Sequence, residues 1–252
     1  MCFRVNKLNN NYNLCSFFHW TMDGKLLTPF TMLMAGASQS GKSTLVYKII
    51  ENANKIFDKA PNRIFICYGQ MQPLYKRIVE TSQCPVTLIE GLPADLVTPS
   101  NSLLIIDDLQ GINGELVSEW FTKKCHHLKT SVIYLVQNLF LKPPSHRTIS
   151  LNSHYMVIFK SPRDSSQIIH LAKQIFPGES QTLISAYREA TAEPYSYIFL
   201  DLKQQTEDIY RLRSSVFPWN CFVFISPKTP TYKWEDWREE LSHGFEVDET
   251  TT

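Results

Sequence analysis

Eight consecutive residues match the phosphate-binding loop pattern G-x-x-x-x-G-K-[ST]. They run from Gly36 to Ser43, after an apolar stretch at 30–35 and before a helical pattern. Glycines allow the tight turn, and amide groups of the loop and the helix start point at an anion. We expect Lys42 to neutralise the β- and γ-phosphates of ATP, and the Ser43 hydroxyl to complete a Mg²⁺ shell. The predicted nucleotide-binding set is Gly36, Ala37, Ser38, Gln39, Ser40, Gly41, Lys42, Ser43 and Thr44.

A pair of acids follows a second apolar run. Residues 103–106 are all leucine or isoleucine, and Asp107 and Asp108 come directly after them. Adjacent acids are tolerated there if they emerge at the carboxyl end of a buried strand, where open α/β sheets bind ligands. We predict Asp107 as the metal residue and Asp108 as the base toward the attacking water. The alternative is a pair of acids that merely opens a turn before Gly111.

A third apolar run, 131–136, also becomes polar at its end, at Gln137. Its end is expected to reach the same crevice, where a glutamine can sense the γ-phosphate or orient the water. A glutamine in that place also suits an ordinary strand end, so periodicity alone leaves both readings open.

The elements that must position these residues alternate between short apolar runs and helical patterns, which predicts an α/β fold with a mainly parallel sheet. A hairpin through Pro218 is expected to join 208–216 to 220–225. Strands are predicted at 30–35, 63–68, 86–90, 103–107, 131–137, 154–160 and 195–202, and helices at 42–54, 74–80, 115–125, 166–175 and 180–191.

Composition fits one globular domain with additions. The chain has 252 residues, 43% of them hydrophobic, and a formal net charge of +1, so the global balance names no partner. Apolar runs fall short of the ~18 residues of a membrane span, and no secretory pattern follows the first residues. The cysteines form no CxxC pair, which favours a reducing compartment. We expect an N-terminal extension at 1–26, the ATPase domain at 27–227 and an acidic tail at 228–252.

One stretch is strongly basic. Between Trp120 and Arg163 there is no Asp or Glu, and seven cations give a net charge of +7. A polyanion such as the DNA backbone is a suitable partner, although for any single lysine a solvated basic face is the better reading. The cations are Lys123, Lys124, Lys129, Lys142, Arg147, Lys160 and Arg163.

Taken together, the motifs between Pro29 and Pro218 resemble the FtsK-HerA type DNA-packaging ATPases of Polinton-like and related double-stranded DNA viruses. The motifs that carry the resemblance beyond the phosphate loop are Cys67-Tyr68-Gly69-Gln70, Pro73-Leu74-Tyr75, Ile106-Asp107-Asp108-Leu109, His126-His127 before 131–140, Arg147 to Asn152 with His154-Tyr155, and Pro162-Arg163-Asp164.

The resemblance implies a ring-forming motor with a RecA-like core. Lys42 and Ser43 then correspond to the phosphate and metal residues, Asp107 and Asp108 to the Walker B pair, and Gln137 to the sensor. The family commonly places a trans-acting arginine after the paired histidines, where this chain has Leu128 and Lys129. That departure leaves Arg147, Arg163 and the lysines Lys123, Lys124 and Lys129 as candidates; a lysine lacks the fork that grips a phosphoryl group.

The expected function is therefore an ATP-driven double-stranded DNA translocase that packages a viral genome. Its expected partners are DNA, further copies of itself in a ring, and a capsid or portal-vertex protein, without a membrane. The expected location is the host nucleus or the site of virion assembly. The rival functions are another P-loop enzyme, such as a nucleoside kinase or a recombinase, and a non-hydrolysing adaptor that binds DNA or a capsid.

Overall fold

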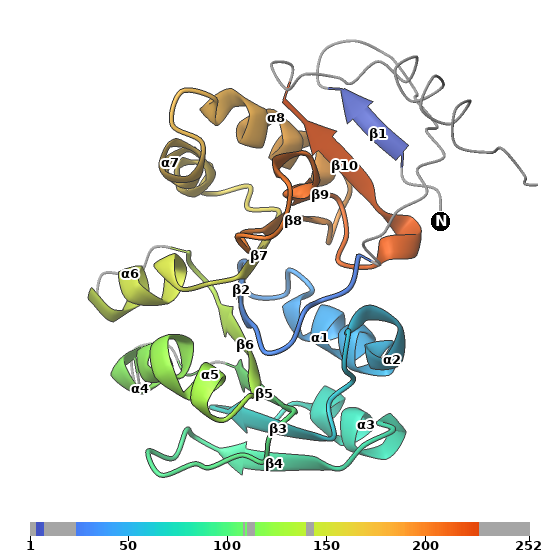
Figure 1. The fold of residues 1–252 in the computed structure, drawn as a ribbon, viewed down its shortest axis with the longest axis vertical. Helices are drawn as coiled ribbons and strands as arrows, with labels where there is room; N and C mark the ends of the chain where they lie inside the picture. Colours follow the sequence, from blue (N-terminus) through green and yellow to red (C-terminus); the bar gives the residue numbers. More distant parts are fainter. Residues whose placement is uncertain (1–3, 8–23, 108, 110–113, 140–143, 227–252) are drawn as a thin grey trace, which may run out of the picture.

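The computed structural model describes residues 4–7, 24–107, 109, 114–139 and 144–226 (Figure 1). The strands are β1 Arg4–Lys7, β2 Thr31–Ala35, β3 Arg63–Tyr68, β4 Val86–Glu90, β5 Ser102–Asp107, β6 Ser131–Val136, β7 Tyr155–Phe159, β8 Tyr197–Asp201, β9 Leu212–Arg213 and β10 Phe222–Ile225. The helices are α1 Lys42–Glu51, α2 Ala53–Ile56, α3 Pro73–Thr81, α4 Gly114–Glu119, π-helix η1 Trp120–Lys124, α5 Cys125–His127, α6 Pro144–Leu151, α7 Ser166–Ile175, α8 Ser180–Ala190, and 3₁₀-helices η2 Asp208–Tyr210 and η3 Pro218–Asn220.

The described strands form one sheet of ten, in the order β1-β10-β9-β8-β7-β2-β6-β5-β3-β4. Neighbours from β7 through β4 pair in parallel, whereas the β7–β8, β8–β9 and β9–β10 pairs are antiparallel. The strand before the phosphate loop, β2, is separated by β6 from β5, the strand that ends at Asp107. The predicted class, a P-loop NTPase fold with a RecA-like, mainly parallel sheet flanked by helices, is confirmed.

Both faces of the sheet are covered. Met32 and Met34 of β2 pack in one core with side chains of α1, α2 and α3, and Leu33 and Ala35 pack in a second core with side chains of α4, α6, α7 and α8. Figure 1 shows these two helical layers on opposite sides of the strands. Strands buried on both faces are apolar almost without interruption, and each buried Leu or Ile contributes roughly 1.5–3 kcal/mol. The centre of the sheet is therefore a firm base for the loops at its edge.

Most predicted elements are found within a few residues of their predicted bounds, and two helices differ for local reasons. The predicted helix 42–54 is divided at Asn52, whose side-chain Nδ2 donates to the Lys48 carbonyl at 2.9 Å. Asparagine competes in this way with helical hydrogen bonding. The sequence-based prediction contains no helix at α6, which begins at Pro144; a proline is compatible with the first turn of a helix.

At the C-terminal end of the described chain the predicted hairpin is present as the antiparallel pair β9–β10, with Arg213 opposite Val223. The strand β1 pairs in parallel with β10, so residues 4–7 of the predicted N-terminal extension belong to the sheet. The predicted domain boundaries stay a prediction, and the acidic tail at 228–252 lies outside the described residues. Within the part of the chain that is described, no helix has both the length and the apolar character of a membrane span.

Candidate nucleotide-binding site

The phosphate loop connects the carboxyl end of β2 to the start of α1, and two of its residues have to be glycine. A Cβ added to Gly36 would lie 2.6 Å from Ser40 Oγ and 2.7 Å from Phe159 Cβ. Gly41 precedes α1 with a φ of 104°, a left-handed conformation that side chains disfavour. The glycine spacing read from the sequence is thus a steric requirement of this turn.

The phosphate loop carries a positively charged side chain and hydrogen-bond donors that an anion can reach. Lys42 Nζ donates to the carbonyl oxygens of Gly36 at 2.6 Å and Ala37 at 2.9 Å, which keeps its charge beside the loop backbone. No side chain caps the start of α1, so its first N–H groups and the positive end of the helix dipole are available to an anion. Ser40 Oγ is buried and has no hydrogen-bond partner among the described residues. These groups suit a polyphosphate.

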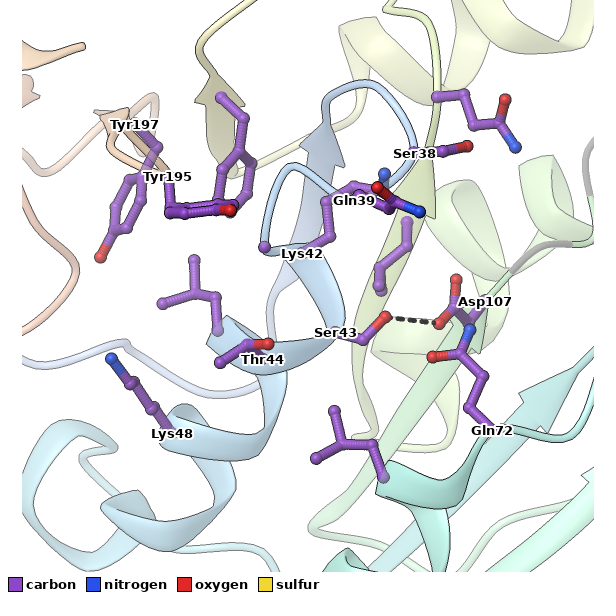
Figure 2. A pocket seen from close by; sticks show the side chains of 16 residues that line it. Ser38, Gln39, Lys42, Ser43, Thr44, Lys48, Gln72, Asp107, Tyr195 and Tyr197 are labelled. Atoms are coloured by element: carbon purple, nitrogen blue, oxygen red, sulfur yellow. Dashed lines mark hydrogen bonds between the residues drawn. The ribbon is translucent and has the colours of Figure 1, made fainter. Parts of the chain in front are cut away.

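The metal residues predicted from the sequence meet at the other side of the loop. Ser43 Oγ at the start of α1 donates to Asp107 Oδ2 at the end of β5, at 3.2 Å (Figure 2). The same oxygen accepts a hydrogen bond of 2.7 Å from the hydroxyl of Tyr75, in α3. Asp107 is only 6% exposed and Tyr75 only 2%. Two hydroxyl donors therefore orient this buried carboxylate.

The side chains of Ser43 and Asp107 fit a Mg²⁺ ion. Both offer hard oxygen atoms, which Mg²⁺ prefers, and their separation shows that the helix start and the strand end converge on one point. Mg²⁺ usually binds one or two protein oxygens together with substrate phosphates, so a small donor set beside a phosphate loop is appropriate.

The predicted sensor, Gln137, directly follows β6 and is exposed. β6 lies between β2 and β5, so its end lies between the phosphate loop and Asp107. The backbone N–H of Gly36 also donates to the carbonyl of Val136 at 3.1 Å. The first residue of the loop is in this way attached directly to the strand that carries the sensor.

A pocket of about 710 Å³ collects most of these side chains, and this volume is in the range of small-molecule sites. Figure 2 shows Asp107 and Gln72 at one end, Lys42 and Ser43 in the middle, and Tyr195 and Tyr197 at the other end. The predicted site residues that line it are Ser38, Gln39, Gly41, Lys42, Ser43, Thr44, Asp107 and Gln137.

The described candidates for the trans-acting cation do not line this pocket. Asp108, the predicted base, lies outside the described residues. Arg147 in α6, Arg163 after β7 and Lys129 before β6 are exposed, and none of them lines the pocket. Arg163 follows the carboxyl end of a strand, at the same edge of the sheet as the phosphate loop, whereas Lys129 precedes an amino end, at the opposite edge.

Four residues of the site carried no role in the sequence-based prediction. Tyr75 and Gln72 follow β3, the neighbour of β5, so the rule that strand ends converge could have indicated them. Tyr197 is the first residue of β8, and Tyr195 lies in the turn before it. This strand runs antiparallel to β7, and sequence periodicity does not reveal strand direction.

No protein-family model matches this chain, and no curated protein does. Among solved structures it is similar to the genome packaging NTPase B204 from Sulfolobus turreted icosahedral virus 2 in complex with ATP-gammaS. The TM-score is 0.44 at 15% identity, over 71% of this chain and 94% of that one. It is also similar to the Legionella pneumophila ATPase DotB, with a TM-score of 0.36 at 17% identity, over 52% of this chain and 40% of that one. At these scores the likenesses carry no argument about activity; the assignment to the P-loop NTPase fold rests on the strand order and the loop described above.

Proposed function

We propose that this chain is a Mg²⁺-dependent ATPase that moves double-stranded DNA, as a ring of identical subunits, into a viral capsid. The observation that carries the ATPase part is the convergence of Lys42, the Ser43–Asp107 pair and Gln137 on one pocket at the carboxyl edge of the sheet. These residues come from the ends of three separate strands. A phosphate-loop motif with only a structural role would not require the other two strand ends to place such residues beside it.

Each side chain then has a defined task in hydrolysis. Lys42 and the open N–H groups of α1 hold the phosphates, and Ser43 and Asp107 hold Mg²⁺, which neutralises phosphate charge when it is bound. Gln137 orients the attacking water, and Asp108, placed by sequence one residue after Asp107, accepts its proton. Such positioning and electrostatic stabilisation is nearly all that a protein contributes to phosphoryl transfer.

The DNA part of the proposal is supported by the basic stretch from 120 to 163. Two of its lysines have intramolecular partners. Lys124 Nζ donates to the Ala94 carbonyl at 2.9 Å, and Lys160 Nζ donates to the Ala192 carbonyl at 2.8 Å. The other described cations of the stretch are exposed. Exposed cations can contact the phosphate backbone of DNA without reading its sequence. These exposed cations are Lys123, Lys129, Arg147 and Arg163.

The decisive measurement is the rate of ATP hydrolysis with and without long duplex DNA. We expect hydrolysis that requires Mg²⁺ and rises with DNA, and we expect Lys42→Ala to abolish it, because that change removes the cation set against the β- and γ-phosphates. Lys59→Ala, at an exposed position away from the pocket, is the matched control. Full activity of Lys42→Ala would refute the site.

Other outcomes of the same assay distinguish the rival functions. Hydrolysis without stimulation by DNA, or phosphate transfer to a nucleoside, would indicate another P-loop enzyme. Nucleotide binding without turnover would indicate an adaptor that binds DNA or a capsid. The proposed location, the host nucleus or the site of virion assembly, follows only if DNA packaging is demonstrated.

A further inference from the structure

Tyr195 presents an exposed aromatic ring beside the phosphate loop. Tyr195 is 72% exposed. It lies close to the phosphate loop, because a Cβ built on Gly41 would be 3.7 Å from Tyr195 Cβ. Its φ of 61° is a left-handed conformation that is unfavourable for a bulky residue. A large ring that is exposed contributes little to the core, so folding does not account for this conformation.

The turn that carries Tyr195 is attached to the end of β7 by Lys160. The Lys160 backbone N–H donates to the Ser196 carbonyl at 3.2 Å, and its side-chain Nζ donates to the Ala192 carbonyl at 2.8 Å. Within the turn, Ser196 Oγ donates to the Glu193 carbonyl at 2.5 Å. Residues on both sides of Tyr195 therefore take part in hydrogen bonds that hold the backbone of the turn from which the ring projects.

The strand order gives the pocket a direction. Asp107 ends β5 and Gln137 follows β6, on one side of β2. Tyr197 begins β8 and Tyr195 lies in the turn before it, on the other side of β2. A triphosphate whose terminal phosphate lies near Asp107 therefore extends its nucleoside toward Tyr195. Figure 2 shows the two tyrosines at that end, beyond Lys42.

We propose that Tyr195 is the stacking platform for the base of a purine nucleoside triphosphate. This inference rests on the proposed function, because it takes the phosphate end of the pocket as given. An aromatic ring supplies a π-face to any base, and a purine covers more of it than a pyrimidine. Tyr197 forms the adjoining wall, with its hydroxyl accepting from the Val216 N–H at 3.2 Å.

The test compares a whole nucleotide with a phosphate chain that has no base. Binding of ATPγS, CTP and inorganic tripolyphosphate, each with Mg²⁺, is measured by titration calorimetry on the full chain. We expect Tyr195→Ala to weaken ATPγS binding about tenfold or more, to weaken CTP binding less, and to leave tripolyphosphate binding unchanged. Tyr195→Phe retains the ring and is expected to bind all three as the unmodified chain does.

A matched control is Trp219→Ala, which removes another exposed aromatic ring, 44% exposed, away from the pocket; it is expected to bind all three ligands normally. The inference is overturned if Tyr195→Ala binds ATPγS with unchanged affinity, or if it loses ATPγS and tripolyphosphate equally. In the latter case the ring supports the phosphate loop and not a base. If the unmodified chain binds neither ATPγS nor tripolyphosphate, the proposed function itself fails, and this inference fails with it.

Discussion

At the scale of single residues, the hydroxyl of Tyr75 helps to orient the carboxylate of Asp107, the predicted metal residue. It donates to Oδ2 at 2.7 Å, inside the protein, where both side chains are almost fully buried. A hydrogen bond to a charged acceptor contributes about 1.5–3 kcal/mol, and a carboxylate held in one orientation binds a metal more tightly than one that rotates.

We expect Tyr75→Phe to raise the Mg²⁺ concentration needed for half-maximal ATP hydrolysis severalfold, with turnover recovered at saturating Mg²⁺. The ring remains, so its packing on Tyr68, at a centroid distance of 5.6 Å, is preserved. Tyr68→Phe is the matched control. An unchanged Mg²⁺ dependence of Tyr75→Phe would show that Ser43 orients the carboxylate without help.

A second comparison distinguishes the roles predicted for the two adjacent acids. Asp107→Asn is expected to impair Mg²⁺-dependent nucleotide binding, since an amide carries no charge and has one acceptor oxygen where the carboxylate has two. Asp108→Asn is expected to retain Mg-ATP binding and to lose turnover, because an amide cannot accept the proton from water. Binding titrations and hydrolysis rates on both variants test this, and the reverse pattern would exchange the two roles.

At the scale of elements, His154 joins the start of β7 to the start of β2. Its Nδ1 accepts a hydrogen bond from the Thr31 N–H at 3.0 Å. Burial, together with the smaller effects of the charges of Lys203 and His126, lowers the pKa of His154 to about 4. An unperturbed histidine titrates near 6.5, so between these values the unfolded chain takes up a proton that the folded chain excludes.

Stability contributed by neutral His154 is therefore complete above about pH 6.5 and decreases as the pH falls toward 4. We expect His154→Asn, whose amide oxygen can replace Nδ1 as the acceptor, to reduce the loss of thermal stability between pH 7.5 and pH 5. Melting temperatures measured across this range test the prediction. The matched control is His127→Asn, at an exposed position, and an equal effect of both variants would contradict the assignment to His154.

Much of the arrangement of elements was predictable, because buried parallel strands leave apolar runs whose polar ends mark the functional edge. This rule placed Asp107 and Gln137 correctly at the pocket. It could not place Tyr195, because a strand has the same apolar pattern in either direction and β8 is antiparallel to its neighbour. The hydrogen bond from Tyr75 to Asp107 depends on how α3 packs against the sheet, and no short stretch of sequence specifies that packing.

At the scale of the whole molecule, the candidates for a trans-acting cation lie at different edges of the sheet. Arg163 follows the carboxyl end of β7, near the level of the phosphate loop, whereas Lys129 precedes the amino end of β6. Only the arginines, Arg163 and Arg147, offer bidentate contact, an effect that can reach ~10³-fold or more in turnover. Lys129 has the position that the resemblance favours.

We expect the variant that lacks the acting cation, among Arg147→Ala, Arg163→Ala and Lys129→Ala, to lose DNA-stimulated turnover and to keep nucleotide affinity. Mixing it with Asp108→Asn is expected to restore activity, since each Asp108→Asn subunit supplies the missing cation to its neighbour. Hydrolysis rates at varied protein concentration accompany the mixing assay. Wild-type turnover in all three variants, or full activity of isolated monomers, would contradict a ring mechanism.

The hydrogen bond from the Gly36 N–H to the Val136 carbonyl has a mechanical consequence. It continues the parallel register of β2 and β6, which pairs Ala35 with Val136, by one step into the phosphate loop. The base of the phosphate loop is therefore linked to the end of β6, next to the predicted sensor, by the same kind of hydrogen bond that joins the two strands. Under the proposed function, the movement of DNA would then arise in segments outside this hydrogen-bonded centre, and the central sheet would be the stationary part of the protein.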